Sequence, residues 1–292
     1  MIDRSFVARA MRGLATFAAV AAVAIAGSTA AVAAPVIVDS HGFEVPWFTT
    51  TFNGTGQLEG QTPATFNGTW LRTKGPGAST ATVQTTVVNA GVQAVEVNRA
   101  AGSDDRWGVP VSGYPSGDNV CIEWDMRVEQ TIGAAGTFGP FFGVEAYDDD
   151  AATIGLLASL GVDASTGDVL YQAPDTGFFT ETGTVVNFGQ WNNFMIDLDF
   201  ATKTASYYFN STLLGAFGFV DENNIPGGLN EFTDANISAL AAAGDPASLA
   251  LTGKAFYDNF LVSDGVCIPE PTAALSAAVA LAALFVRRRA VC

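Results

Sequence analysis

A chain of 292 residues is long enough for one large domain or two small ones. It has 13 basic and 29 acidic residues, for a formal net charge of −16. Because no run of basic residues is interleaved with aromatic ones, the composition disfavours binding to nucleic acid or to anionic lipid.

Residues 1–33 have the order of a secretory signal peptide, which is a basic start, an apolar run and small residues at the end. The basic positions are Arg4, Arg9 and Arg12. Ala31–Ala33 fits the small-x-small cleavage rule, and Ser28–Ala30 is a second site of the same type. The sequence therefore predicts export and removal of this segment; a buried or amphipathic first helix is the alternative.

Residues 267–292 form a second end segment with three parts. Pro269, Glu270 and Pro271 precede an apolar run from Thr272 to Val286, and Arg287, Arg288 and Arg289 follow it. As a helix, this run is about 22 Å long, shorter than a hydrocarbon core of about 30 Å. With the arginines kept on the cytoplasmic side, we expect a temporary transmembrane helix that leaves the body of the protein outside.

The segment between these ends is strongly acidic. Six of the 13 basic and two of the 29 acidic residues lie in the ends, so the centre keeps 7 basic and 27 acidic residues, a net charge of −20. Such acidity is typical of a solvated surface on an exported protein, and it gives a modest preference for divalent cations.

Two of the three cysteines, Cys121 and Cys267, lie in the part predicted to be exported, whereas Cys292 lies beyond the arginine cluster. In an oxidising compartment such a pair indicates a disulfide, with two unrelated buried thiols as the alternative. His41 is the only histidine, and no zinc-ligand spacing is present.

Short β-patterned runs alternate with turn signals across residues 34–264 and predict one all-β domain, an antiparallel sandwich or barrel. The expected strands lie at residues 36–38, 82–88, 94–98, 121–129, 138–147, 153–162, 169–172, 191–200, 204–209 and 255–262. Asp163–Gly167 is expected to be a hairpin loop. The exception is Asp234–Ala243, where Asp234 is a candidate cap for a short helix.

The C-terminal segment resembles the PEP-CTERM sorting signal in its Pro-Glu-Pro motif, apolar helix and terminal arginines, in that order. The resemblance implies a Gram-negative source and an exosortase-type membrane protease that cleaves near Pro269–Pro271. The body would then be released or attached at the cell surface or in the extracellular matrix, often alongside exopolysaccharide production.

The body resembles exported concanavalin A-like (laminin G-like) sandwiches, which have a jelly-roll topology. The matching stretches are Gly56–Gln61, Trp191–Phe194, Asp197–Asp199, Tyr208–Asn210 and Phe256–Phe260. The resemblance covers roughly residues 35–264. It implies the fold, and it leaves the ligand open.

One branch of this fold hydrolyses β-glucans with a Glu-x-Asp-x-Glu strand. Glu123 and Asp125 start that pattern, but Arg127 occupies the third position. The next carboxylate on that face, Glu129, lies about 20 Å from Glu123 along an extended strand, too far for either hydrolytic geometry. We therefore expect no catalytic residues and no enzyme activity, with a glycoside hydrolase as the least favoured alternative.

Asp148, Asp149 and Asp150 are clustered carboxylates of the kind that calcium binds, and Asp258 is a further candidate ligand. Their spacing matches no calcium loop, so an acidic, solvated turn is favoured. No other cofactor is expected. The sequence leads to an exported, lectin-like protein that binds carbohydrate or matrix, with a structural surface protein lacking a small ligand as the alternative.

Overall fold

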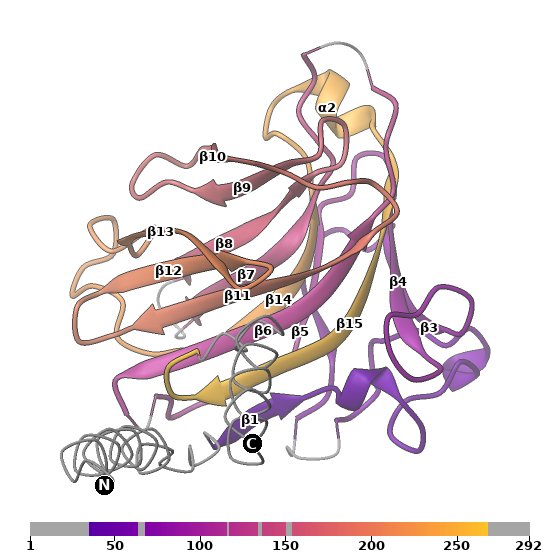
Figure 1. Cartoon of the computed structure of the whole chain (residues 1–292), viewed down its shortest axis with the longest axis horizontal. Coiled ribbons are helices and arrows are strands. Elements are labelled where there is room, and N and C mark those ends of the chain that lie inside the picture. The colour runs from indigo at the N-terminus through magenta and orange to yellow at the C-terminus, as the bar shows by residue number, and fades with distance from the viewer. Residues whose placement is uncertain (1–34, 64–67, 116, 134–135, 150–153, 268–292) are drawn as a thin grey trace, which may run out of the picture. The chain divides into compact units, whose positions relative to one another are not determined.

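A computed structural model describes residues 35–63, 68–115, 117–133, 136–149 and 154–267. Two antiparallel sheets pack face to face around one main core (Figure 1). This confirms the predicted all-β sandwich. The predicted signal peptide and all of the sorting segment except Cys267 lie outside the described residues, so both stay predictions. In the part that is described, no helix has the length and apolar character needed to cross a membrane.

The first sheet, sheet A, has eight strands. Its seven-strand path runs β13 (Thr212–Gly218), β12 (Thr204–Phe209), β11 (Trp191–Asp199), β6 (Asn119–Val128), β15 (Gly253–Asp264), β4 (Ala94–Arg99) and β3 (Thr80–Gln84). The eighth strand, β1 (Val36–Asp39), pairs with the end of β15. The first and last strands of the domain are thus hydrogen-bonded neighbours.

The second sheet, sheet B, has seven strands. Their order is β10 (Phe179–Val185), β9 (Asp168–Gln172), β8 (Ile154–Asp163), β7 (Phe141–Asp149), β14 (Asp234–Leu240), β5 (Asp105–Gly108) and β2 (Leu71–Lys74). The described helices are the short η1 (His41–Phe43), η2 (Phe52–Gly54) and α2 (Pro246–Ala250). Strands β2, β5, β10 and β13 were not expected from the sequence.

Strand β6 illustrates why these residues form a sandwich. Ile122, Trp124, Met126 and Val128 are buried in the main core, as the alternation of apolar and polar residues predicts. Trp124 stacks on Phe194 of the neighbouring strand β11, with ring centroids 5.6 Å apart. The opposite side of β6 carries its charged residues on the outer face of sheet A.

The helix expected at Asp234–Ala243 is wrong, because residues Asp234–Leu240 form strand β14 between β7 and β5. Ala235, Ile237 and Ala239 contribute to the core, and alternate residues take the other face. A capped helix does occur shortly afterwards: Asp245 Oδ1 accepts a hydrogen bond from the Ala247 amide at the start of α2. Hydrogen bonding to strands on both sides and burial in the core outweigh the intrinsic helix propensity of the alanines in this segment.

A disulfide joins Cys121 of β6 to Cys267, the two cysteines paired from the sequence. The bond packs with Met195 and the half-buried Tyr208 in a small cluster apart from the main core. It closes a chain segment with a sequence separation of 146 residues. The end of the described chain is thereby fixed to a central strand of sheet A.

We expect the C121A/C267A double substitution to lower the free energy of unfolding by about 5 kcal/mol. Closing so long a loop removes much conformational entropy from the unfolded chain, which is the basis of this estimate. Chemical denaturation followed by tryptophan fluorescence measures the loss, and far-ultraviolet circular dichroism checks that the fold is retained. Equal transition midpoints for the two proteins would contradict the assigned role of the bond.

Candidate functional site

The outer face of sheet B, the side turned away from the core, combines polar and apolar side chains. In β7, Phe142, Val144 and Ala146 belong to the core. Because side chains alternate along a strand, Phe141, Gly143, Glu145, Tyr147 and Asp149 lie on the outer face. Glu145 and Tyr147 are nonetheless almost fully buried. A buried carboxylate on an outer face requires neighbours that compensate its charge.

Arg106 of β5 supplies that compensation. Its Nε donates to Glu145 Oε2, and its Nη2 lies 3.4 Å from Glu145 Oε1. Ser238 Oγ and the Tyr147 hydroxyl donate to the same Oε2 atom at 2.8 and 3.2 Å. Burial, followed by the Glu145 carboxylate, raises the pKa of Tyr147 well above its usual range, so this phenol remains a donor.

Two further groups extend this charged cluster toward the end of β7. Lys74 Nζ lies 3.7 Å from the centroid of the Tyr147 ring and 3.8 Å from Asp149 Oδ2. Burial lowers the pKa of Lys74. Burial also raises the pKa of Asp234, which accepts a hydrogen bond from Asn236 Nδ2 at 2.8 Å. Arg106 is paired with Glu145 and Lys74 with Asp149, so the first role of these two cations is to neutralise carboxylates on this face.

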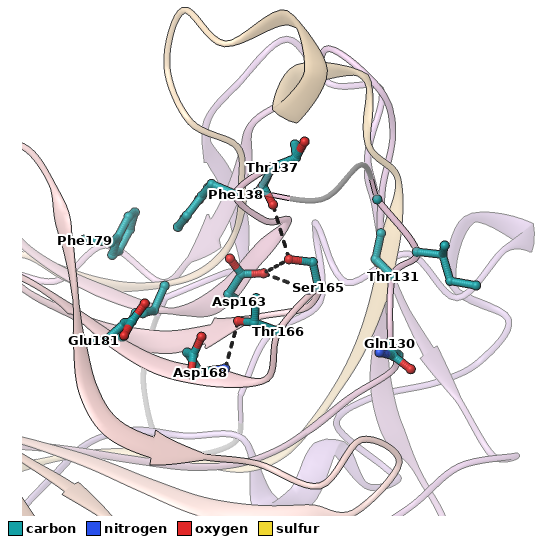
Figure 2. Close-up of a pocket in the computed structure, with 14 residues that line it drawn as sticks. Gln130, Thr131, Thr137, Phe138, Asp163, Ser165, Thr166, Asp168, Phe179 and Glu181 are labelled. Atoms are coloured by element: carbon teal, nitrogen blue, oxygen red, sulfur yellow. Dashed lines mark hydrogen bonds between the residues drawn. The ribbon is translucent and has the colours of Figure 1, made fainter.

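A groove of about 500 Å³ lies at the other end of the same face (Figure 2). One wall comes from strands β9 and β10, in which Glu181 pairs directly with Leu170. Asp168 and Phe179 lie two residues from this pair on the same face of the ribbon. Residues 130–133 form the facing wall, and residues 136–138 complete the lining, with Phe138 beside Phe179 (Figure 2).

The floor of the groove is the turn between β8 and β9, which begins at Asp163 as the sequence predicts. Asp163 Oδ1 accepts the amide and hydroxyl of Ser165, each at 2.7 Å, and Oδ2 accepts the Gly139 amide at 3.0 Å. Ser165 Oγ also reaches the Thr137 carbonyl at 3.3 Å (Figure 2). These bonds fix the floor to the segment that carries Phe138.

Stacked phenylalanines form the apolar part of the groove. Phe179 stacks on Phe138 with centroids 5.5 Å apart, and on the buried Phe141 with centroids 4.3 Å apart. The Phe141 ring lies against Gly143 and Gly161, where an added Cβ would be 2.7 and 2.6 Å from its Cζ atom. Glycine at both positions therefore lets the aromatic stack lie close to the sheet.

The carboxylates that the sequence singled out on β6 lie on the outer face of the other sheet, sheet A. Asn193 Nδ2 donates to Glu123 Oε1 at 2.9 Å and to Asp125 Oδ1 at 3.1 Å. Asp125 Oδ2 accepts two more amide groups, from Asn89 and Asn259, each at 2.7 Å. Arg127 and Glu129 form an ion pair at 2.8 Å. The strand is thus a row of paired polar groups.

The candidate calcium ligands are not brought together in the part of the chain that is described. Asp148 Oδ2 accepts the amides of Asn230 and Glu231, and Asp149 faces Lys74. Asp258 accepts amides from Asn89, Ala90 and Asn259, and burial raises its pKa to about 6. Asp150 lies outside the described residues. Among those described, no group of three or more His, Cys, Asp or Glu side chains is placed to hold a metal.

Sequence reasoning missed the groove and the charged cluster as sites. The sequence predicts the Asp163–Gly167 segment only as a hairpin loop, and it assigns no role to Phe179. An alternation of Asp168 and Leu170, followed by Phe179 and Glu181, marks one face of a hairpin. Arg106 and Glu145 are 39 residues apart, and only the order of strands in sheet B brings them into contact.

No protein-family model and no curated protein sequence matches this chain. Solved structures share its fold. "Cellulose induced protein, Cip1" has 13% sequence identity and a TM-score of 0.50, and the match covers 75% of this chain and 98% of that one. An endo-β-1,4-glucuronan lyase from the fungus Trichoderma reesei has 9% identity and a TM-score of 0.45, covering 66% and 96%. A sialidase has 9% identity and a TM-score of 0.45, covering 66% of this chain but only 17% of its own.

These similarities confirm the concanavalin A-like sandwich and correct one expectation. The sequence led us to expect no enzyme activity, because the Glu123–Glu129 strand lacks a hydrolytic arrangement. That expectation is wrong as drawn: a lyase and sialidases are among the structures that share the fold, so one unsuitable strand does not exclude catalysis elsewhere on it.

We expect Arg106→Met to lower the free energy of unfolding by about 3 kcal/mol, because it leaves the Glu145 carboxylate buried without its cation. Adding Glu145→Gln removes the unpaired charge and should recover about half of that loss. Urea denaturation measures both values.

Lys254→Met is the matched control, since the Lys254–Glu96 pair is more exposed and 3.2 Å long. It should cost less than about 1 kcal/mol. A double variant as unstable as Arg106→Met would show that charge compensation is not what Arg106 provides.

Proposed function

We propose that the sandwich binds carbohydrate in the groove formed by strands β9 and β10 with residues 130–133 and 136–138. The observation that carries this proposal is the stacked pair Phe138 and Phe179 beside the carboxylates of Asp168 and Glu181 in a cavity of about 500 Å³. Its volume lies within the range of about 300–1,000 Å³ that is common for small-ligand sites.

The chemistry of a sugar ring fits this lining. A pyranose has an apolar face of C–H groups, which packs on aromatic rings, and an edge of hydroxyl groups. Carboxylates accept hydrogen bonds from hydroxyls, and such charge-assisted bonds are stronger than neutral ones. The solved structure of similar fold that covers three quarters of this chain is named for its induction by cellulose, which agrees with this class of ligand.

We also propose that the protein is exported and sorted to the cell surface or extracellular matrix. Residues 1–33 support export, and the motif at Pro269–Pro271 with Arg287–Arg289 supports processing by an exosortase-type membrane protease. The β-sandwich is then the delivered part, in contact with extracellular polysaccharide.

Expression of the full chain in a Gram-negative host with such a protease should give a product that has lost residues 1–33 and most of the C-terminal segment. Mass spectrometry of both termini locates the cuts. Replacing Pro269, Glu270 and Pro271 with alanine should leave the C-terminal segment attached. An unprocessed C-terminus on the exported wild-type protein would contradict the sorting proposal.

For carbohydrate binding, a glycan array followed by calorimetry on the best ligand is the direct test. Phe179→Ala should weaken binding about tenfold, because it removes the ring that supports the sugar face. Phe178→Ala is the matched control: Phe178 is the neighbouring phenylalanine, 75% exposed, and does not line the groove.

Equal affinity of the two variants would place binding elsewhere, and no binding to any glycan would refute the proposal. The chain length of each recovered glycan is measured as well, since enzymes share this fold.

A further inference from the structure

We infer that the groove selects glycans with protonated amino groups, so that polymers containing unsubstituted glucosamine are its ligand class. This inference rests on the proposed function and specifies it. Its basis is the charge of the groove: the ionisable residues that line it are Asp163, Asp168 and Glu181, and the described lining contains no lysine, arginine or histidine.

The three carboxylates differ in how far they are already used. Both oxygens of Asp163 accept hydrogen bonds from Gly139 and Ser165, so this carboxylate is held in place and already used. Within the described residues, the carboxylates of Asp168 and Glu181 have no hydrogen bond or ion pair. Figure 2 shows both on the same side of the groove, below Phe179. They are available to a ligand.

An ammonium group on a sugar is a suitable partner for these two carboxylates. It donates up to three hydrogen bonds and carries the opposite charge, so each contact is charge-assisted. An N-acetyl group at the same position has one N–H and no charge, so it lacks the Coulomb attraction to the carboxylates of Asp168 and Glu181. The groove should therefore distinguish an amine from an acetamide on otherwise identical rings.

Anionic glycans are disfavoured by the same charges. A uronate or sulfate in the groove would face only acidic groups, on a domain whose central segment carries a net charge of −20. The field of such a surface lowers the local concentration of anions and raises that of cations. Two described cations on the same face, Arg106 and Lys74, are already engaged with Glu145 and Asp149.

The two phenylalanines, Phe138 and Phe179, make the expected selectivity more than a general attraction of the groove to cations. Phe138 and Phe179 provide a surface for the C–H face of a ring, while Asp168 and Glu181 lie along the wall beside it. A glucosamine unit can contact both at once. A simple polyamine offers the charge without the ring face, so it should bind more weakly than a glucosamine oligomer of equal charge.

The test compares four probes on the intact exported domain by calorimetry at low ionic strength: oligomers of glucosamine, N-acetylglucosamine, glucose and glucuronate of equal length. Glucosamine oligomers should bind about tenfold more tightly than N-acetylglucosamine oligomers. The difference should shrink near 1 M salt, where the Debye length falls to about 3 Å.

The variant Asp168→Asn/Glu181→Gln should abolish most of this preference while keeping the residual affinity for N-acetylated oligomers. Glu231→Gln, which removes a charge from an exposed residue at the opposite end of sheet B, is the control and should keep the preference.

Two outcomes would overturn the inference while leaving carbohydrate binding intact: equal or tighter binding of the N-acetylated or neutral oligomers, or calcium-dependent binding of the glucuronate oligomer. If none of the four probes binds and no glycan on an array binds, both the proposed function and this inference are refuted.

Discussion

The packing of the inner face of β6 against its neighbours is the interaction on which the other features depend. Trp124 of β6 stacks on Phe194 of β11. On its other side, β6 pairs with β15, the last strand of the domain. The disulfide from Cys121 to Cys267 adds a covalent link from this strand to the end of the described chain. Because β6 lies between β11 and β15 in sheet A, anything that separates it from the core would disrupt both of these strand pairs.

The outer face of sheet B divides into two parts with different physical requirements. Around Glu145, a buried carboxylate is stable only because Arg106, Ser238 and Tyr147 surround it. Around Phe179, the aromatic stack depends on Gly143 and Gly161, which let Phe141 lie against the sheet. The first part has its charges matched internally. In the second, Asp168 and Glu181 have no charged partner among the residues that the structure describes, which is why the groove is the candidate for binding.

The row of carboxylates on β6 shows how a sequence pattern can suggest chemistry that the structure uses otherwise. Glu123 and Asp125 lie on the same face, as the period of two requires, but amide groups of Asn193, Asn89 and Asn259 hold them. Asp258 is likewise occupied by backbone amides. Among the described residues, Asp168 and Glu181 of sheet B have carboxylates without such partners, and they lie in a hairpin that no catalytic motif marked.

Local chemistry in the sequence determined the fold class, most of the strands, the Asp163 turn and the pairing of the cysteines, because alternation and turn residues act over a few positions. Its end segments also carry the predictions of export and sorting. The tertiary structure alone decided that Asp234–Leu240 is a strand, that Arg106 meets Glu145, and that residues 130–133 and 136–138 line one groove with Phe179 and Glu181. Each of these depends on which strands become neighbours, and neighbours are chosen by burial of the whole core rather than by any local pattern.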